Sequence, residues 1–425
     1  MLKPFPDSLW LATATPRPEC AALQGTSETD VAIVGGGFTG LSAALHLAER
    51  GVPVTVLEAQ DIGWGASGRN GGQVNPGWKV LPDEIRARLG EPAAGELLSM
   101  LDEATGLVFD LIERHGIDCD AVRTGYIQGA VGSRGERYAR DWAAQWGALG
   151  APVRMLDKAE VSGLIGTEVY DCGVLDERGG NVQPLSYVRG LARAALAAGA
   201  QILSASPAQS VVPDGAGWCV RTPDGELRAR QVVLGTNGYT DALWPDLARN
   251  VVPVKSVIVA TQPLGDNIAA TLLQERRHVS ETLRIQAYYR LDRDNRLVFG
   301  GRGGTFEAPE HFDGEGLKRR VRDMFPQLGE PDWQYCWGGF VAMTPDYTPK
   351  LLQLAEGVFA GLGYNGRGVA MATLLGKQLA HCVSGEATAM PLTTSRPIPL
   401  HRLRNFGVAA RVAWGRALDQ LDARF

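Results

Sequence analysis

The stretch Asp30–Glu58, DVAIVGGGFTGLSAALHLAERGVPVTVLE, decides the fold because it contains every part of a βαβ dinucleotide-binding unit. Its first five residues form a short apolar strand, and Gly35, Gly37 and Gly40 complete a G-x-G-x-x-G turn into a helix. In such a unit the first glycine permits the tight turn and the second lets the backbone approach a pyrophosphate. The third lets the helix pack closely on the strand. We therefore expect a dinucleotide at this turn.

The helix and the second strand of the unit support the same interpretation. The amino-terminal amides and the dipole of the helix would face the diphosphate. The strand Pro53–Leu57 ends at Glu58, whose carboxylate can accept hydrogen bonds from both hydroxyls of a ribose. Glu58 suits the ribose of NAD as well as that of FAD, so the unit alone leaves the cofactor open. The apolar face of the helix follows i, i+3, i+4 and i+7 spacing, with Leu41, Ala44, Leu45 and Ala48.

The bulk composition excludes several classes of protein. The 425 residues are 45% hydrophobic and 21% charged, which is typical of a globular protein with two or three domains. The net charge of −5 argues against nucleic acid as the main partner. The six cysteines form no C-x-x-C pair and the six histidines show no metal-binding spacing, so we expect neither a disulfide framework nor a metal. Without a long apolar run or a secretory signal, we expect no transmembrane segment and a cytoplasmic location.

Periodicity along the chain predicts the order of the other elements. Residues 82–147 look largely helical, and residues 251–301 alternate β-branched and polar side chains as in an antiparallel sheet with one solvated face. We expect further helices at Glu96–His115, Pro184–Gly199 and Val369–Ala380. Strands are expected at Gln201–Ser204, Gln231–Thr236 and Gly357–Gly363.

This order predicts an α/β fold with a discontinuous Rossmann-like nucleotide-binding domain. An α+β domain, built on a mixed or antiparallel sheet, is inserted into it in two pieces. We place residues 1–80, 165–245 and 335–425 in the nucleotide-binding domain, and residues 81–164 and 246–334 in the inserted substrate domain.

Two glycine-rich segments far from the first turn complete the candidate binding site. The loop Gly63–Gln73, GWGASGRNGGQ, follows the ribose-binding strand, and its backbone amides can wrap around an extended phosphate-bearing ligand. The second segment, Gly361–Gly368 (GLGYNGRG), joins a strand to a helix whose amino terminus carries roughly half a unit of positive charge. We interpret both as cofactor contacts rather than as a flexible connector and a simple helix cap.

These segments, with the strand VVLGTNGYT at Val232–Thr240 and the opening SLWLATA at Ser8–Ala14, resemble the FAD-dependent amine and amino-acid oxidases. The prototypes of that superfamily are D-amino-acid oxidase, glycine oxidase and sarcosine oxidase. The likeness is greatest to the bacterial γ-glutamylputrescine oxidoreductase type, in which ASGRNGG and a G-[HR]-G turn recur. It spans Ser8 to about Leu403.

The resemblance implies that the cofactor is FAD, extended along the nucleotide-binding domain, with the inserted sheet covering the flavin. Adenosine is expected near Glu58 and isoalloxazine between the Arg69–Gln73 loop and the Tyr364–Val369 turn. Since no Cys or His is clearly placed for covalent attachment, we expect non-covalent FAD. The expected contacts are Gly35, Gly37, Gly40, Glu58, Ala66, Ser67, Arg69, Asn70, Gly71, Gly72, Gln73, Val211, Gly363, Tyr364, Gly366, Gly368 and Val369.

The sequence departs from the sarcosine oxidase pattern at two positions. Sarcosine oxidases place a lysine two residues after their G-H-G turn to hold the substrate carboxylate, and this chain has Ala370 there. The middle of the turn is Arg367 instead of His. Either Arg367 takes the role of anchor, or the substrate has no α-carboxylate.

Candidate catalytic residues on the covering sheet are Tyr288, Arg290 and Lys255, besides Arg367. Tyr288 and Arg290 share one face of a strand and could cage and anchor an amine-bearing acid. The alternative is that Tyr288 is a core residue and Arg290 pairs with a surface acid. Lys255 could be a buried cation that promotes electron transfer from flavin to oxygen, or could lie on a solvated sheet face.

The combined motifs favour oxidation of a C–N bond in a primary or secondary amine or amino acid. A hydride would pass to flavin N5, and the imine would be hydrolysed. Alternatives are FAD-dependent oxidation of an alcohol or hydroxy acid, a FAD-binding subunit of a larger dehydrogenase, a domain acting on modified RNA, and an NAD protein. The acidic balance disfavours RNA. The electron acceptor, whether oxygen, a quinone or another carrier, is left open by the sequence, as are the substrate and the oligomeric state.

Overall fold

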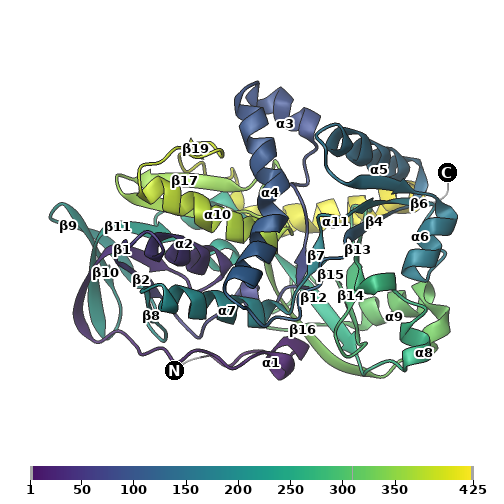
Figure 1. Ribbon diagram of the computed structural model, residues 1–425, viewed down its shortest axis with the longest axis horizontal. Coiled ribbons are helices and arrows are strands. Elements are labelled where there is room, and N and C mark those ends of the chain that lie inside the picture. Colours follow the sequence, from purple (N-terminus) through teal and green to yellow (C-terminus); the bar gives the residue numbers. More distant parts are fainter. Residues whose placement is uncertain (1–2, 309, 423–425) are drawn as a thin grey trace.

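The chain folds around two large β-sheets in the computed structural model, which describes residues 3–308 and 310–422 (Figure 1). One sheet has nine strands and the other has eight. Helices cover the outer faces of both sheets. The α/β architecture predicted from the sequence, with a second sheet inserted into a Rossmann-like unit, is confirmed.

The nine-stranded sheet is built on the βαβ unit. Strand β1 (Gly25–Val34) leads into helix α2 (Phe38–Ala48) and returns as β2 (Val54–Leu57), and β1 pairs in parallel with both β2 and β11. The order is β19-β17-β18-β11-β1-β2-β8, with a β9–β10 hairpin attached to β11. The remaining strands are β8 (Gln201–Leu203), β9 (Ser210–Asp214), β10 (Gly217–Arg221), β11 (Gly225–Leu234), β17 (Lys350–Ala355), β18 (Val358–Leu362) and β19 (Leu392–Thr393).

The eight-stranded sheet is mixed, as expected, because β13 pairs in parallel with β4 while its other pairings are antiparallel. The strands of this sheet do not all fall within the residues that we assign to the substrate domain from the sequence. Strand β6 and the whole of β16 belong to this sheet, although residues 165–245 and 335–425 were assigned to the nucleotide-binding domain. In sheet order the strands are β16 (Trp333–Met343), β12 (Val252–Thr261), β15 (Leu297–Arg302), β14 (Tyr288–Leu291), β13 (His278–Glu281), β4 (Tyr126–Ala130), β6 (Cys172–Asp176) and β5 (Val153–Leu156).

The helices lie close to their predicted positions. Residues 82–147 are largely helical but also contain β4, which periodicity missed because all five of its residues are buried and show no alternation. A short pair, β3 (Gln73–Val74) and β7 (Gly180–Asn181), forms a third sheet. The α-helices besides α2 are α1 (Leu9–Thr13), α3 (Pro82–Leu89), α4 (Ala93–Arg114), α5 (Gly132–Gly147), α6 (Lys158–Ile165), α7 (Pro184–Ala197), α8 (Asp266–Ala269), α9 (Glu315–Met324), α10 (Gly368–Val383) and α11 (Arg404–Asp422).

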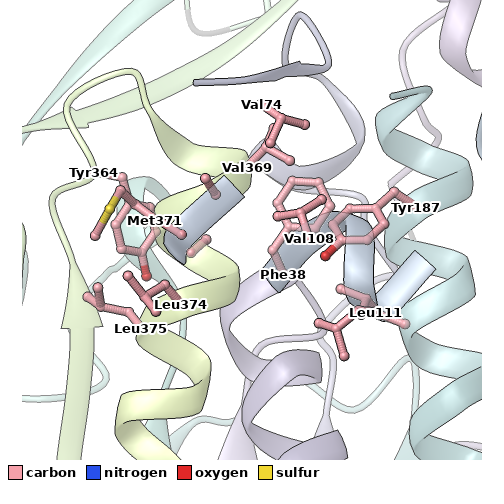
Figure 2. Packing of buried hydrophobic residues seen from close by; sticks show 14 of the residues in the cluster. Phe38, Val74, Val108, Leu111, Tyr187, Tyr364, Val369, Met371, Leu374 and Leu375 are labelled. Atoms are coloured by element: carbon pink, nitrogen blue, oxygen red, sulfur yellow. The ribbon is translucent and has the colours of Figure 1, made fainter. Parts of the chain in front are cut away.

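The largest core cluster joins α2, α4, α7 and α10 on one face of the nine-stranded sheet. Figure 2 shows Phe38 and Tyr187 facing each other in this cluster, with ring centroids 5.2 Å apart. Helix α10 supplies Val369, Met371, Leu374 and Leu375, and Leu111 comes from α4. The packing of these helices therefore fixes the position of α2. Because the glycine turn leads directly into α2, the turn is held rigid as well.

We expect the substitution Gly40→Ala to destabilise the protein, because an added Cβ would lie 2.0 Å from the Gly35 carbonyl oxygen. Either the helix or the turn must then move, at a cost of at least about 1–3 kcal/mol. The free energy of unfolding of the FAD-free protein measures this. The control is Gly163→Ala in α6, where an added Cβ meets nothing within 4 Å and stability should be unchanged or slightly higher. Equal stability of the two variants would contradict the packing role of Gly40.

Candidate active site

A cavity of about 1900 Å³ lies between the two large sheets. Its wall includes the carboxyl ends of the parallel strands β1, β2 and β11, at Val34, Leu57 and Gly235. Ligands of open α/β sheets bind at this edge. The opposite wall comes from β12, β14 and β16 of the second sheet, and α11 closes one side.

The first glycine turn holds Glu58 at the edge of the cavity. The Gly35 amide donates to the Leu57 carbonyl at 2.9 Å, and φ of Gly35 is +110°, a conformation that favours glycine. One Glu58 carboxylate oxygen accepts a hydrogen bond from the Gly36 amide (2.7 Å) and the other accepts one from the Gln60 amide (2.8 Å). Burial raises the pKa of Glu58. A carboxylate has about four acceptor sites, so two remain for ribose hydroxyls. The predicted role of Glu58 thus fits its geometry.

The loop of residues 63–73 borders the cavity through Ala66, Ser67, Arg69, Asn70 and Gly71, and Gln73 also lines it. The Ser67 hydroxyl accepts a hydrogen bond from the Phe38 amide (2.9 Å), so this distant loop caps the amino terminus of α2. Asn70 braces the loop: its amide donates to the carbonyls of Ala66 and Ser67, and its oxygen accepts from the Gly72 amide at 2.8 Å.

The Arg69 side chain points into its own loop. Its Nε donates to the Trp64 carbonyl (2.8 Å), and the guanidinium carbon lies 4.3 Å from the centre of the Trp64 ring. Burial lowers the pKa of Arg69. Gly72 stands outside the cavity wall: its φ is +74°, and an added Cβ would lie 2.1 Å from the Val182 carbonyl oxygen. Gly72 therefore shapes the loop, and cofactor contact is available mainly through the neighbouring backbone.

The carboxy-terminal turn reaches the cavity through Tyr364, Gly366, Gly368 and Val369. Tyr364 is buried, and its hydroxyl lies 2.5 Å from the Thr39 hydroxyl and 3.0 Å from the Gly361 carbonyl, to which it donates. Gly363 lies behind the wall and donates its amide to Asn237 at 2.9 Å. The two glycine-rich turns, separated by more than 300 residues, therefore meet at one site.

Two other expected cofactor residues also stand behind the cavity. Gly40 is a packing residue, as its close approach to Gly35 shows. Val211 lies in β9, opposite Val220 of β10, and Ala208 lines the cavity in that region instead. Contact of Val211 with the cofactor stays a prediction, since the described cavity wall in this region includes Ala208 and not Val211.

Tyr288 lines the cavity, as predicted, and lies under Gly71 of the cofactor loop. Its hydroxyl is 2.8 Å from the Ser256 hydroxyl on the neighbouring strand β12. Burial raises the pKa of Tyr288 to about 12, so the phenol is neutral at physiological pH. A fixed, neutral hydroxyl and ring at this place can hold a substrate against the cofactor.

Arg290, by contrast, is buried beneath the loop and does not line the cavity. Its guanidinium donates to the Asn181 side chain and to the Val182 carbonyl (3.0 Å), and it lies 5.0 Å from the ring centre of Trp10. Arg290 shares a strand face with Tyr288, but β7 and the segment after it cover that position. We therefore withdraw Arg290 as the substrate anchor and assign it to holding the loop.

Lys255 lines the cavity. Its ammonium donates to the carbonyls of Ala308 (2.6 Å) and His311 (2.9 Å) and lies 3.6 Å from Glu307. The side chain is 5% exposed, so it is not on a solvated sheet face. Because its hydrogen bonds go to the loop after β15, Lys255 fixes that loop, and its part in electron transfer to oxygen stays a prediction.

Arg367 and Lys79 bring two positive charges to the cavity beside the amino terminus of α10. Arg367 is buried, donates to the Pro76 carbonyl, and lies 5.0 Å from the ring centre of Trp142. Its Nε has no hydrogen-bond partner within the described residues. The Lys79 ammonium donates to Gln286 at 3.0 Å, and burial together with Arg367 lowers its pKa to about 8.

Sequence reasoning missed Lys79. It belongs to no motif, and its place follows from the path of the chain after β3. The nearest signal was its position six residues after Gln73, at the end of the cofactor loop. Tyr126 also lines this part of the cavity, with its hydroxyl 2.7 Å from that of Ser280. Strand β4, which carries Tyr126, was not predicted either.

The residues present fit FAD. The cavity joins the glycine turn, a carboxylate with free acceptor sites, a backbone-rich loop and the amino terminus of a long helix. A model of the family described as FAD dependent oxidoreductase matches residues 30–382. The chain belongs to this family. Its cofactor is FAD, and it is an oxidoreductase.

Individual relatives cover most of the chain. The γ-glutamylputrescine oxidoreductase of Escherichia coli is 32% identical, over 89% of this chain and 89% of the relative. A probable oxidoreductase, OrdL, of Rhizobium meliloti is 33% identical, over 92% and 91%. The crystal structure of glycine oxidase from Geobacillus kaustophilus superposes with a TM-score of 0.72 at 24% identity, over 87% of this chain and 99% of that one. That last likeness establishes the fold.

Two features are absent from the described residues. They contain no helix that is both long and apolar enough to cross a membrane. Nor do they bring together three or more His, Cys, Asp or Glu side chains that could hold a metal ion. The cavity wall within the described residues contains none of the six cysteines, and His401, which lines it, binds the Val251 carbonyl at 2.8 Å. Non-covalent attachment of FAD stays a prediction.

We expect Glu58→Gln to weaken FAD binding about tenfold or more, because the amide replaces one charged acceptor with a donor. Hydrogen bonds to a charged group are worth about 1.5–3 kcal/mol. The dissociation constant of FAD from the reconstituted apoprotein measures the effect. The matched control is Glu28→Gln, an exposed residue of β1 in the nine-stranded sheet. Unchanged FAD affinity in the Glu58 variant would contradict the ribose-binding role.

Proposed function

We propose that the protein oxidises a C–N bond in an amine or amino acid that also carries an anionic group. One observation carries the substrate class: the described cavity wall contains ten lysines and arginines but only two carboxylates, Glu58 and Asp241. This excess of positive charge stands in a chain whose net charge is −5. The named activities of relatives, γ-glutamylputrescine oxidoreductase and glycine oxidase, support the C–N bond as the reacting group.

FAD supplies the redox step when bound: it accepts a hydride from the carbon that bears the amine, and water hydrolyses the released imine. The protein has to orient the substrate and keep water out. Tyr288 and Tyr126 provide rigid walls at this place, since both rings are largely buried and both hydroxyls are held by serines. The phenols are neutral, because burial raises the pKa of each.

Lys79 and Arg367 are proposed to anchor the anionic group of the substrate. Both lie at the helix α10 terminus, whose dipole also favours negative charge. The Arg367 Nε has no partner among the described residues but is itself buried, so Arg367 contributes mainly its positive charge to this part of the cavity. Lys79 has one side-chain partner, Gln286, and two further donors. This pair would replace the lysine that sarcosine oxidases carry at the position of Ala370.

The proposed reaction class is tested by anaerobic bleaching of the FAD-loaded protein. Amines and amino acids with an N-alkyl, cyclic or extended acidic chain should reduce the visible absorbance of the flavin, and peroxide formed on admission of air separates an oxidase from a dehydrogenase. Bleaching by hydroxy acids alone would support the alternative of alcohol oxidation and contradict our proposal.

The proposed anchor predicts a pH dependence for carboxylates that have no amine, such as benzoate. The depressed pKa means that Lys79 is charged below about pH 8 and neutral above it. Benzoate affinity, measured from the perturbed flavin spectrum, should therefore fall as pH rises through about 8. Lys79→Met should weaken binding about tenfold or more at pH 7 and remove the inflection, whereas Lys79→Arg should keep binding at higher pH.

The matched control is Lys158→Met at the exposed start of α6, which should leave the profile unchanged. The alternative ligand of the same charge is the reduced flavin itself. If Lys79→Met lowered the flavin reduction potential but left benzoate affinity unaltered, the cation would serve the cofactor, and the proposed substrate anchor would be wrong.

A further inference from the structure

Helix α11 presents an apolar face to solvent. The described residues include six large apolar side chains that are at least half exposed, and all of them lie on α11, on the turn before it, or on the loop that touches it. Phe406 and Trp414 are 68% and 66% exposed. The Phe306 ring, from the loop after β15, lies 5.5 Å from that of Phe406. The six are Phe306, Leu400, Leu403, Phe406, Trp414 and Leu421, which we call the apolar patch.

The polarity of the helix is the reverse of that of most surface helices. Its inward face carries charged groups, and its outward face carries none. At 100° per residue, one continuous sector of the helix contains only apolar residues and glycine. The inward side is fixed by Arg284, which binds Asp419 (3.0 Å) and Asp422 (2.6 Å), and by buried Gly415 against Ile285. Ordered along the chain, the outward sector is Phe406, Gly407, Ala410, Ala413, Trp414, Ala417 and Leu421.

The segment that carries five of the six patch residues is basic, whereas Phe306 stands beside the acid Glu307. Residues 387–418 contain no Asp or Glu, and Arg402 and Arg416 are exposed at the edges of the patch. The two acids of α11, Asp419 and Asp422, both bind Arg284 on the inward side of the helix, away from the apolar sector. The five arginines of this segment are Arg396, Arg402, Arg404, Arg411 and Arg416.

We propose that α11 and the apolar patch dock on the surface of an anionic phospholipid bilayer. Aromatic and leucine side chains on one face of a helix, flanked by arginines, are the features that place a helix in the headgroup region. The helix lies beside α5 (Figure 1). Its inward residues line the cavity, and four of the six patch residues, Leu400, Leu403, Phe406 and Trp414, border the same cavity at the surface. Docking would therefore set one wall of the FAD cavity against the membrane, whichever substrate the enzyme takes.

Charge is the reason to prefer lipid over a second copy of the chain. In a symmetric contact through this face, Arg402 and Arg416 of one copy would lie near the same two residues of the other copy. Residues 387–418 contain no acid that could pair with them. A bilayer with anionic headgroups supplies the missing negative charge at the same depth as the aromatic rings.

The test is sedimentation of the FAD-loaded protein with vesicles of phosphatidylcholine, alone or mixed with phosphatidylglycerol. The protein should pellet with the anionic vesicles only, and binding should weaken sharply at about 0.5 M salt. The double substitution Arg402→Gln/Arg416→Gln should weaken vesicle binding about 25-fold, at about fivefold per arginine. Phe406→Ser/Trp414→Ser should weaken it at least about tenfold.

Two control variants change exposed residues outside the patch, and one further variant changes the patch without disturbing the fold. Arg137→Gln/Arg319→Gln and Val169→Ser/Ile268→Ser change exposed residues elsewhere and should leave binding unaltered. Ala413→Glu adds a carboxylate to the exposed face next to Trp414 without removing a large side chain, and should also weaken binding. Flavin absorbance and the thermal transition of each variant report its fold.

Three results would overturn the proposal. The first is equal binding to neutral and anionic vesicles, and the second is vesicle binding that none of the patch variants changes. The third is a dimer in sedimentation velocity, without lipid, that Phe406→Ser/Trp414→Ser converts to monomer. That last result would make a second copy of the chain the occupant of the patch.

Discussion

The close contact between α2 and α10 is the constraint on which the rest of the site depends. A Cβ added at Gly376 would lie 2.5 Å from the Ser42 Cβ and 2.6 Å from the Thr39 carbonyl oxygen, so the two helices meet backbone to backbone. At the end of this contact Tyr364 reaches the Thr39 hydroxyl. The first and last glycine-rich turns are thereby fixed to each other, and a cofactor that spans both meets a preformed site.

A second set of contacts fixes the inserted sheet to this frame. The indole of Trp337, on β16, donates to the Arg69 carbonyl (3.0 Å), and that of Trp10 donates to the Asn70 carbonyl (2.7 Å). Since Ser67 of the same loop caps α2, the loop is tied to both sheets at once. The cavity is thus bounded by a loop that cannot move without breaking buried hydrogen bonds, which cost more to leave unmade than they contribute when formed.

The sequence predicted what is local and missed what depends on a covering segment. The βαβ unit, Glu58 and the turn at Tyr364 were found because their chemistry is written in consecutive residues. Alternation along β14 correctly put Tyr288 and Arg290 on one face, but it could not show that Val182 covers only the second of them. Lys79 gave no pattern at all, since its pKa is lowered first by burial and then by the charge of Arg367, almost 300 residues away in the chain.

The net charge of the chain did not show where positive charge gathers, because this also depends on the fold. Charges are averaged over a surface that the fold sorts into regions, and here the basic side chains collect around the cavity while most acids lie elsewhere. His278 illustrates how the fold concentrates this charge. Burial and the neighbouring Arg290 and Arg367 lower its pKa to about 3, so it stays neutral under the Tyr126 ring. The positive charge near the helix α10 terminus is therefore left to Arg367 and, below about pH 8, to Lys79.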